Sequence, residues 1–295
     1  MNLTFRQLRA FLALVEQGSI TGAARALCVT QPTVSMQLKE MTENVGLPLY
    51  EVTGKKLHLT EAGNDLAATA RAMFQEWDRF EQGIAAKRGL TAGRLRLAVV
   101  STAKYFIPRM LGDFCRMHPD VEIALEVLNR DGVIQRLRDN LDDLYIMSKP
   151  PADVDAVTHA FLANPLVLIA PLSHPLANRT GITLTDLQEE RFVLREKGSG
   201  TRLNAVSHFE SQRFVPRIRL EMGSNEALKQ AVAGGLGLSV VSQHALGTDL
   251  TGQGLTVLSV EGFPIISSWY TVYLCGKRLS PLAEAFMGYL SNFSE

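Results

Sequence analysis

The sequence predicts a multidomain fold that combines an all-α winged helix-turn-helix, a long linker helix and a two-lobed α/β module. Three observations support this prediction. Short helical patterns joined by a tight turn lie near the N-terminus, an apolar heptad pattern follows them, and strand-like runs then alternate with helical patterns. Because a chain of 295 residues exceeds the usual size of one hydrophobic core, we expect several domains.

Composition limits the classes of function. The chain has no formal net charge and is 46% hydrophobic, which is typical of a globular protein and leaves nucleic-acid binding to a local site. Arg6 and Arg9 interrupt the first apolar stretch, and no apolar run reaches membrane-spanning length, so we expect a cytoplasmic protein without a signal peptide or membrane partner. Cys28, Cys115 and Cys275 are scattered, and we expect reduced thiols that serve as small apolar core residues.

Three helices are predicted before residue 46. Apolar residues recur at three- and four-residue steps over residues 5–15, and a short alanine-rich helix follows, with Ser19 or Thr21 as its cap. Thr30 is expected to cap the third helix, which carries Pro32 in its first turn. Two short helices joined by a tight turn match the helix-turn-helix pattern.

A two-stranded ribbon is predicted next. The segment LPLYEVTGKKLHLTEAG alternates around a turn at Thr53-Gly54 and carries Lys55 and Lys56 at its tip. Taken alone, a Gly-Lys-Lys turn is most often solvated surface. With this ribbon as a wing, residues 1–60 form the predicted winged helix-turn-helix domain.

Residues 61–88 are predicted to form the linker helix. Its apolar residues are spaced four and three apart, which favours pairing with another helix over packing on its own domain. The alternative is a single helix that packs on the domain it follows. The expected dimerisation seam comprises Leu66, Ala70, Met73, Trp77, Phe80 and Ile84.

Beyond a hinge at residues 89–93, the βαβ rhythm predicts two α/β lobes with mainly parallel sheets covered by helices on both faces. The last strand and helix lack a unit of their own, so we expect them to return to the first lobe. The predicted boundaries are 94–161 and 267–295 for lobe 1, and 162–266 for lobe 2. Folds of this kind bind small ligands in the cleft between the lobes.

The segment FRQLRAFLALVEQGSITGAARALCVTQPTVSMQLKEMTENVGLPLYEVTGKKLHLTEAG closely resembles the DNA-binding region of the LysR-type transcriptional regulators. The resemblance extends over the whole chain, and REKGSGTR, LEMGSNEALKQAV and GKRLSPLAEAF resemble the RuBisCO-operon regulator (CbbR-like) branch. It implies a periplasmic-binding-protein-like (type 2) effector module, double-stranded promoter DNA as a partner, and homodimers or homotetramers. It further implies contact with RNA polymerase in an activator, no cofactor, no metal and no enzymatic activity.

The resemblance makes the third helix the recognition helix. Small polar side chains at a helix N-terminus suit base edges and phosphates in the major groove, and Gln31 is the expected base reader. Met36 and Gly22 stand where many members carry arginine or another polar residue, so we expect a single subunit to bind weakly. The alternative is an ordinary capped helix with a solvated face. The expected DNA contacts are Thr30, Gln31, Pro32, Thr33, Ser35, Gln37, Lys39, and Lys55 and Lys56 in the wing.

Polar residues at strand and helix ends predict an anion site between the lobes. Our hypothesis places a small anionic metabolite between Ser101/Thr102 and Thr201/Arg202, with few acidic side chains nearby. The alternative is that Ser101 or Thr102 only caps a helix. The CbbR-like branch implies phosphorylated or carboxylated carbon metabolites, or a nicotinamide nucleotide. The expected effector-binding residues are Ser101, Thr102, Lys104, Asn129, Arg130, Lys149, Gly200, Thr201, Arg202, Ser224 and Asn225.

Four other functions compete with this interpretation. A two-lobed enzyme, or a small-molecule-binding protein without a DNA role, would share the α/β module. However, the six histidines show no metal-ligand spacing, and no nucleophile elbow is present. A periplasmic solute-binding protein would need a signal peptide. A redox sensor of this family uses a cysteine pair in the middle lobe, and residues 162–266 contain no cysteine.

Overall fold

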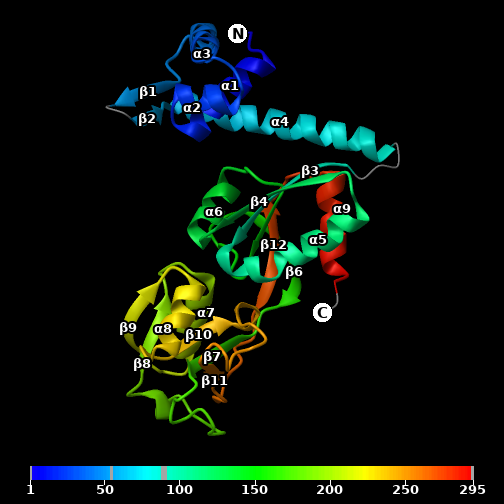
Figure 1. Ribbon diagram of the computed structural model, residues 1–295. Coiled ribbons are helices and arrows are strands. Elements are labelled where there is room, and N and C mark those ends of the chain that lie inside the picture. Colours follow the sequence, from blue (N-terminus) through cyan, green and yellow to red (C-terminus); the bar gives the residue numbers. More distant parts are fainter. Residues whose placement is uncertain (1, 54–55, 88–91, 294–295) are drawn as a thin grey trace. The chain divides into compact units, whose positions relative to one another are not determined.

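A computed structural model describes residues 2–53, 56–87 and 92–293 (Figure 1). The chain divides into two compact units, Met1–Glu81 and Gln82–Glu295, and each is described by itself below. Among the described helices, none combines the length and the apolar character that crossing a membrane requires.

The first unit begins with three packed helices, α1 (Phe5–Gln17), α2 (Ile20–Ala26) and α3 (Gln31–Val45). Their apolar faces meet in one core. The small side chains of Ala23 and Ala24 in this core allow the helices to approach one another closely. The α1 helix begins with a capping box between Thr4 and Gln7, and it ends at Gly18, whose φ of 64° is left-handed. The three-helix prediction is confirmed.

The predicted ribbon is also present as β1 (Tyr50–Thr53) and β2 (Lys56–Leu59), which pair antiparallel. Directly after it, α4 (Glu61–Lys87) begins. A Cβ atom at Gly63 would lie 1.8 Å from the carbonyl oxygen of Leu49, so only glycine permits the start of α4 to pack this closely on the preceding loop. The Thr60 hydroxyl reinforces this junction by donating to Pro48 O at 2.6 Å.

The α4 helix serves two roles along its length. Leu66 packs against the core of the helix-turn-helix unit, and Ala70 is fully buried. Further along, Met73, Trp77 and Phe80 are exposed although they are large and apolar. The first part of the expected seam therefore lies inside its own unit, and the second part remains open.

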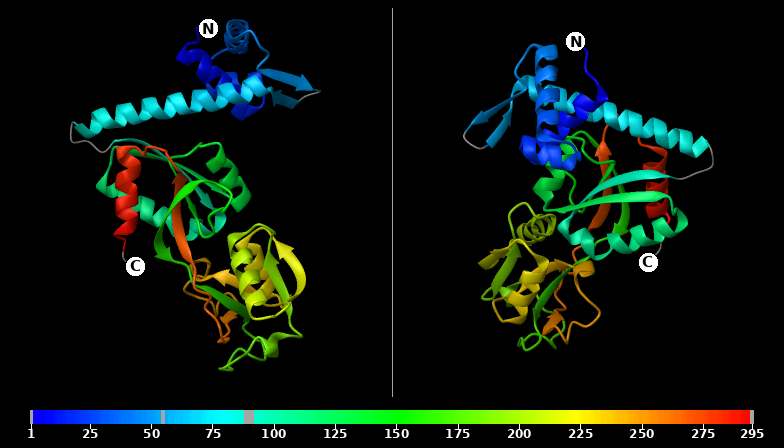
Figure 2. Two further views of the ribbon diagram at one scale, coloured as in Figure 1. Left: turned by 180° about the vertical axis from the view of Figure 1, so that it is seen from behind. Right: turned by 45° about the horizontal axis from the view of Figure 1, so that its top comes forward.

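In the second unit, lobe 1 is built on a five-stranded sheet in the order β4-β3-β5-β12-β6 (Figure 2). The core strand β3 pairs parallel with β4 on one side and with β5 on the other. Right-handed crossovers therefore place the two connecting helices α5 and α6 on opposite faces. The C-terminal helix α9 joins α5, where Phe114 and Phe286 meet edge to face at 5.0 Å. The bounds are β3 (Gly93–Val100), η1 (Ser101–Tyr105), α5 (Ile107–Met117), β4 (Val121–Leu128), α6 (Arg130–Arg138), β5 (Leu144–Met147), β6 (Ala156–Ala163), β12 (Ser268–Leu274) and α9 (Pro281–Ser291).

Lobe 2 repeats this arrangement around β8. Phe192 and Leu194 of β8 belong to the core that includes α7, whereas Val193 faces the core that includes α8, as the two-residue period of a strand requires. A bridge between Phe192 and Leu238 joins β8 to the segment before β10. The bounds are β7 (Leu166–Pro171), η2 (Thr185–Leu187), β8 (Arg191–Arg195), α7 (Gly200–Ser211), β9 (Arg217–Met222), α8 (Asn225–Ala233), β10 (Ser239–Ser242), η3 (Gln243–Ala245) and β11 (Leu255–Val257).

Two strands of the five-stranded sheet lead to and from lobe 2. The chain leaves lobe 1 after β6 and returns to it before β12. The two connecting segments lie side by side, and the backbone N–H of Asn164 donates to Ser267 O at 2.8 Å. The Asn164 side chain is buried and accepts from Ser242 Oγ at 2.6 Å. After this return, β12 pairs with both β5 and β6 in the sheet of lobe 1.

Several expectations about the second unit are wrong in detail. The sheets are mixed rather than mainly parallel, since β12 runs antiparallel to β5 and β6, and β7 runs antiparallel to β10 and β11. The strand β6 was not predicted. The expected helix at TDLQ is only the three-residue turn η2. Of the predicted hinge, residues 89–91 lie outside the described residues.

The three cysteines do not lie in the core. Cys28 and Cys275 are exposed and Cys115 is half-buried, so the expectation of buried apolar thiols is wrong. Cys28 occupies the turn between α2 and α3 with a φ of 55°, a left-handed conformation that is uncommon for residues other than glycine. All three thiols are free in the structure, as expected.

Candidate functional site

The start of α3 presents polar side chains to solvent. Gln31, Ser35 and Lys39 are exposed, whereas Val34 and Leu38 on the other face are buried in the core. This separation follows from the helical period and fixes which side chains the helix can offer a partner. These three exposed residues belong to the set that the sequence predicts to contact DNA.

The hydroxyl of Thr30 does not cap α3, contrary to expectation. Thr30 stands at the N-cap position, but its Oγ1 lies 2.8 Å from Thr33 Oγ1, and no side-chain cap is formed. The Thr30–Thr33 pair instead projects two hydroxyls at the helix start, beside the positive end of the helix dipole. A phosphate oxygen could bind at this helix start in the place that a capping side chain would otherwise occupy.

The basic candidates near this surface are few. Lys39 lies 3.9 Å from Glu43 in an exposed pair that contributes little. Lys55 lies outside the described residues, and for Lys56 only the backbone is described, which pairs with Thr53 in the ribbon. Pro32 and Gln37 lie in the first two turns of α3, as predicted.

We expect Gln31→Ala to lower operator affinity by roughly tenfold, because a bidentate amide contact to one base contributes about 1–3 kcal/mol. Gln17→Ala, which removes an exposed amide at the end of α1, is the matched control and should leave affinity unchanged. Fluorescence anisotropy with a labelled operator measures both. An unchanged affinity for the Gln31 variant would show that this amide does not read a base.

An apolar hollow lies on the first unit where α1 approaches α4. Phe5 contacts Phe74 at 5.3 Å and Trp77 at 5.7 Å between ring centroids, and Trp77 continues the contact to Phe80 at 5.8 Å. Trp77 and Phe80 are nonetheless 45% and 58% exposed, which is unusual for clustered aromatic rings. The hollow is lined by Phe5, Thr69, Ala72, Met73, Glu76, Trp77 and Phe80.

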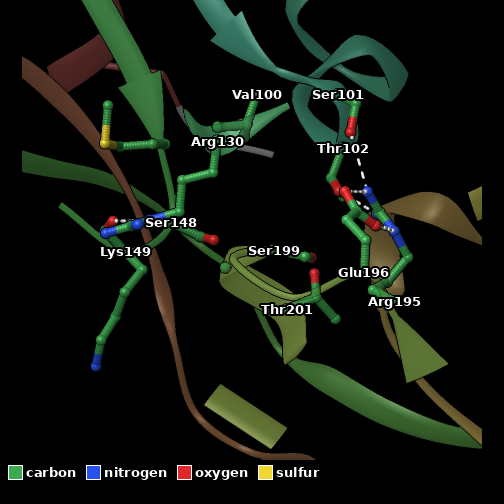
Figure 3. Close-up of a pocket in the computed structure, with 12 residues that line it drawn as sticks. Val100, Ser101, Thr102, Arg130, Ser148, Lys149, Arg195, Glu196, Ser199 and Thr201 are labelled. Carbon is green, nitrogen blue, oxygen red and sulfur yellow. Dashed lines mark hydrogen bonds and ion pairs between the residues drawn. The ribbon is translucent and has the colours of Figure 1, made fainter. Parts of the chain in front are cut away.

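A second site lies in the second unit, where the carboxyl ends of the parallel strands of both lobes converge. Ser101 follows β3, Ser148 follows β5 and Arg195 ends β8, so each side chain is placed by a strand end. Figure 3 shows Ser101 and Thr102 facing Arg195 and Glu196, with Arg130 and Lys149 on the other side of the pocket. The pocket is lined by Val100, Ser101, Thr102, Arg130, Met147, Ser148, Lys149, Arg195, Glu196, Ser199, Gly200 and Thr201.

Arg195 is the centre of a hydrogen-bond network that joins the lobes. Its side chain is buried, and Nη1 donates to Asn225 Oδ1 at 2.7 Å while Nη2 donates to Ser101 Oγ at 3.3 Å. Asn225 Nδ2 in turn donates to Thr102 Oγ1 at 3.1 Å. The hydroxyls of Ser101 and Thr102 therefore face the guanidinium of the other lobe and do not cap a helix.

Glycines let the opposite wall approach closely. A Cβ atom at Gly200 would lie 2.8 Å from Ser148 Oγ, and one at Gly198 would lie 3.2 Å from the Asp131 carboxylate. Gly198 also has a φ of 90°, which glycine adopts without strain. The loop before α7 can thus press its backbone against lobe 1.

Of the eleven predicted effector residues, six line this pocket: Ser101, Thr102, Arg130, Lys149, Gly200 and Thr201. Arg202 does not. Its guanidinium lies 2.7 Å from Glu221 and donates to Arg195 O at 2.9 Å, so it supports the strand end from behind. Asn129 caps α6 by accepting from Gly132 N at 2.9 Å. Asn225 lies behind Arg195.

Sequence reasoning missed Arg195 and Glu196, the main charged pair of the site. The signal was available, because Arg195 directly follows the apolar residues FVL of the predicted strand RFVLRE, and a charge at the end of a buried strand needs a partner. The pocket lining contains one acidic side chain, Glu196, which pairs with Arg195, while Glu226 faces Lys104 outside that lining.

Lys104 and Ser224 belong to a second contact between the lobes, here called the clasp. Glu226 on α8 accepts from Tyr105 Oη at 2.6 Å and from Ser224 Oγ at 3.0 Å, and it lies 2.9 Å from Lys104 Nζ. Partial burial by itself raises the pKa of the Glu226 carboxyl, but the hydrogen bonds from Tyr105, Lys104 and Ser224 outweigh it and hold that pKa at about 2.

We expect Glu226→Gln to lower the free energy of unfolding by no more than about 1 kcal/mol, because the carboxylate is half-exposed. Since the folded-state pKa is depressed, the stabilisation is fully present above pH 4.5 and is lost as the pH falls toward 2. Thermal melts of wild type and variant should therefore differ by a constant amount above pH 4.5 and converge toward pH 2. A difference that changes across neutral pH would contradict this assignment.

Comparisons with known proteins cover both units. A family profile described as "LysR substrate binding domain" matches residues 88–294, and one described as "Bacterial regulatory helix-turn-helix protein, lysR family" matches residues 5–64. The HTH-type transcriptional activator CmpR of Synechocystis sp. is 44% identical over 294 residues, which cover 100% of this chain and 97% of the relative. The RuBisCO operon transcriptional regulator of Acidithiobacillus ferrooxidans is 45% identical over 287 residues, with 97% and 93% covered.

Solved structures show the same architecture. The regulatory domain of Synechocystis PCC6803 CcmR, in complex with 2-PG, is 49% identical with a TM-score of 0.65, over 67% of this chain and 95% of that one. Full-length CbnR complexed with its target DNA is 21% identical with a TM-score of 0.69, over 98% of this chain and 99% of that one, and supports the fold alone.

Proposed function

This chain belongs to the LysR family of DNA-binding transcriptional regulators, and on that premise we propose that it controls carbon-fixation genes in response to a small anionic metabolite. The pocket between the lobes carries this proposal. Arg130, Lys149 and Arg195 line it together with hydroxyl groups and the start of α7, all of which favour an anion.

Relatives support the choice of pathway and of ligand. Similar regulators are named for the RuBisCO operon, and the CcmR regulatory domain, at 49% identity, was solved with 2-PG bound. An anion of that size would be held by both lobes, because Ser101 and Thr102 come from one lobe while Ser199 and Thr201 come from the other.

The proposed mechanism is a two-state equilibrium that the anion biases. A ligand that contacts both lobes binds their closed arrangement more tightly than an open one, and so shifts the population toward it. In a homodimer or homotetramer this shift would alter how several helix-turn-helix units are presented to spaced half-sites on promoter DNA. As a cytoplasmic activator, the assembly would then contact RNA polymerase.

The test is DNase footprinting of the full-length protein on the promoter of a carbon-fixation operon from the same genome, with and without 2-PG. We expect protection at spaced half-sites, and a change in its extent when 2-PG is added. A thermal shift with 2-PG, absent with an uncharged compound of similar size, would show binding directly. Identical footprints and melting temperatures under every condition would overturn the effector proposal, and absence of protection would overturn the assigned target.

A further inference from the structure

Glu196 holds the guanidinium that an anionic ligand would need. Its Oε2 accepts from Arg195 Nε at 2.8 Å and its Oε1 accepts from Arg195 Nη2 at 2.9 Å, which is the bidentate geometry that a bound carboxylate or phosphate adopts on arginine. Arg195 is only 3% exposed, so no second anion can reach the same edge of the fork while Glu196 occupies it.

The surroundings show why this carboxylate matters. Among the described residues that line the pocket, Glu196 is the one acidic side chain, beside Arg130, Lys149 and Arg195. Buried guanidinium groups require a counter-charge, because removing an unpaired ion from water is strongly unfavourable. Glu196 supplies that charge from within the chain, and its partial exposure leaves it a path to swing away.

The remaining contacts of Arg195 would survive such a movement. Nη1 stays bonded to Asn225 and Nη2 lies near Ser101, so the guanidinium keeps its position when the carboxylate leaves. The fork would then be presented, already oriented, to an incoming anion. Figure 3 shows Glu196 beside Arg195 and below Ser101.

We infer that Glu196 is an internal counter-anion, which the effector must displace from Arg195 in order to bind. This inference rests on the proposed function, because it concerns the same pocket. Glu196 would set the lowest effector concentration that the regulator detects, and it would favour ligands whose charge and geometry compete with a carboxylate. Neutral compounds and weak anions would leave the internal pair intact.

The test compares wild type with Glu196→Gln, in titrations of the full-length protein with 2-PG and with inorganic phosphate by calorimetry. Glutamine keeps the shape and one acceptor for Arg195 but removes the competing charge, so we expect the dissociation constant to fall by about tenfold or more. Glu189→Gln removes the same charge from a surface pair with Arg217 and should change affinity less than about threefold. The gain with phosphate should be larger on the alkaline side of its second ionisation, where the probe carries more charge.

Each outcome decides between the two proposals. If wild type binds 2-PG and Glu196→Gln binds it equally or more weakly, Glu196 is a ligand contact or a bystander, and this inference alone is overturned. If neither protein binds either anion, the effector proposal is overturned together with it. A tighter complex that shows no dependence on the charge of the phosphate would also count against displacement, because it would point to a change of shape.

Discussion

Replacing Trp77 and Phe80 together by glutamate is expected to yield a monomer whose operator affinity is lower by about a hundredfold or more. Both side chains are largely exposed although their rings cluster with Phe5, and they lie on the heptad face of α4. Charges on such a face oppose pairing with a second helix. Few basic side chains accompany α3, so two units acting together must supply the affinity that one lacks.

The measurement combines light scattering for the oligomeric state with anisotropy for operator binding. Leu172→Glu, which adds the same charge at an exposed apolar residue in a loop of lobe 2, is the matched control and should stay oligomeric and bind normally. A monomeric double variant with wild-type affinity would disprove the requirement for paired units. A double variant that remains oligomeric would disprove the role of this face.

Replacing Arg195 by methionine is expected to weaken 2-PG binding by about a hundredfold or more, while binding to operator DNA without effector is retained. The guanidinium contacts Ser101 of lobe 1 and Asn225 of lobe 2, so its loss removes a cation from the pocket and a contact between the lobes. Methionine fills most of the volume but cannot pair with an anion.

The matched control for this variant is Arg217→Met, which breaks an exposed pair with Glu189 in the same lobe. It should bind 2-PG as wild type does. Titration calorimetry measures 2-PG binding, and footprinting separately measures binding to operator DNA. Retention of full effector affinity by the Arg195 variant would show that the anion is held by the Arg130 and Lys149 side of the pocket alone.

The first unit was largely predictable because its structure is local. The helices follow from apolar spacing, and their ends follow from Gly18, Ser19 and Pro32, each of which acts within a few residues of its own position. The prediction that the Thr30 side chain caps α3 was wrong, for a reason that the spacing of residues does not reveal. A neighbouring hydroxyl, that of Thr33, offers Thr30 an alternative partner.

The second unit was less predictable because its strands pair over long distances. The strand β6 reads AVTHAFLA, lies at the edge of the sheet, and has only half-buried and exposed side chains, so no clear apolar alternation marks it. The antiparallel direction of β12 depends on where the chain returns from lobe 2. That return is decided by packing of the whole module.

In the pocket, too, features set by local sequence were predicted and those set by the wider fold were not. Polar residues that directly follow strands, such as Ser101 and Lys149, were predicted as site residues, because strand ends converge at one edge of a sheet. Arg202 was predicted as a site residue because it lies at the helix start beside Thr201, where its guanidinium could pair with an anion, and Arg195 was not predicted. The backbone turn between them decides which guanidinium enters the cleft.

The sequence by itself determined the order of the parts of this regulator, its helix-turn-helix, and the polar character of its cleft, because periodicity and capping act over short stretches. Only the tertiary structure decided which groups of the two lobes meet. Arg195 donates to Ser101 and Glu226 accepts from Tyr105 of the other lobe, because contacts between residues so far apart in the sequence depend on how the whole module folds.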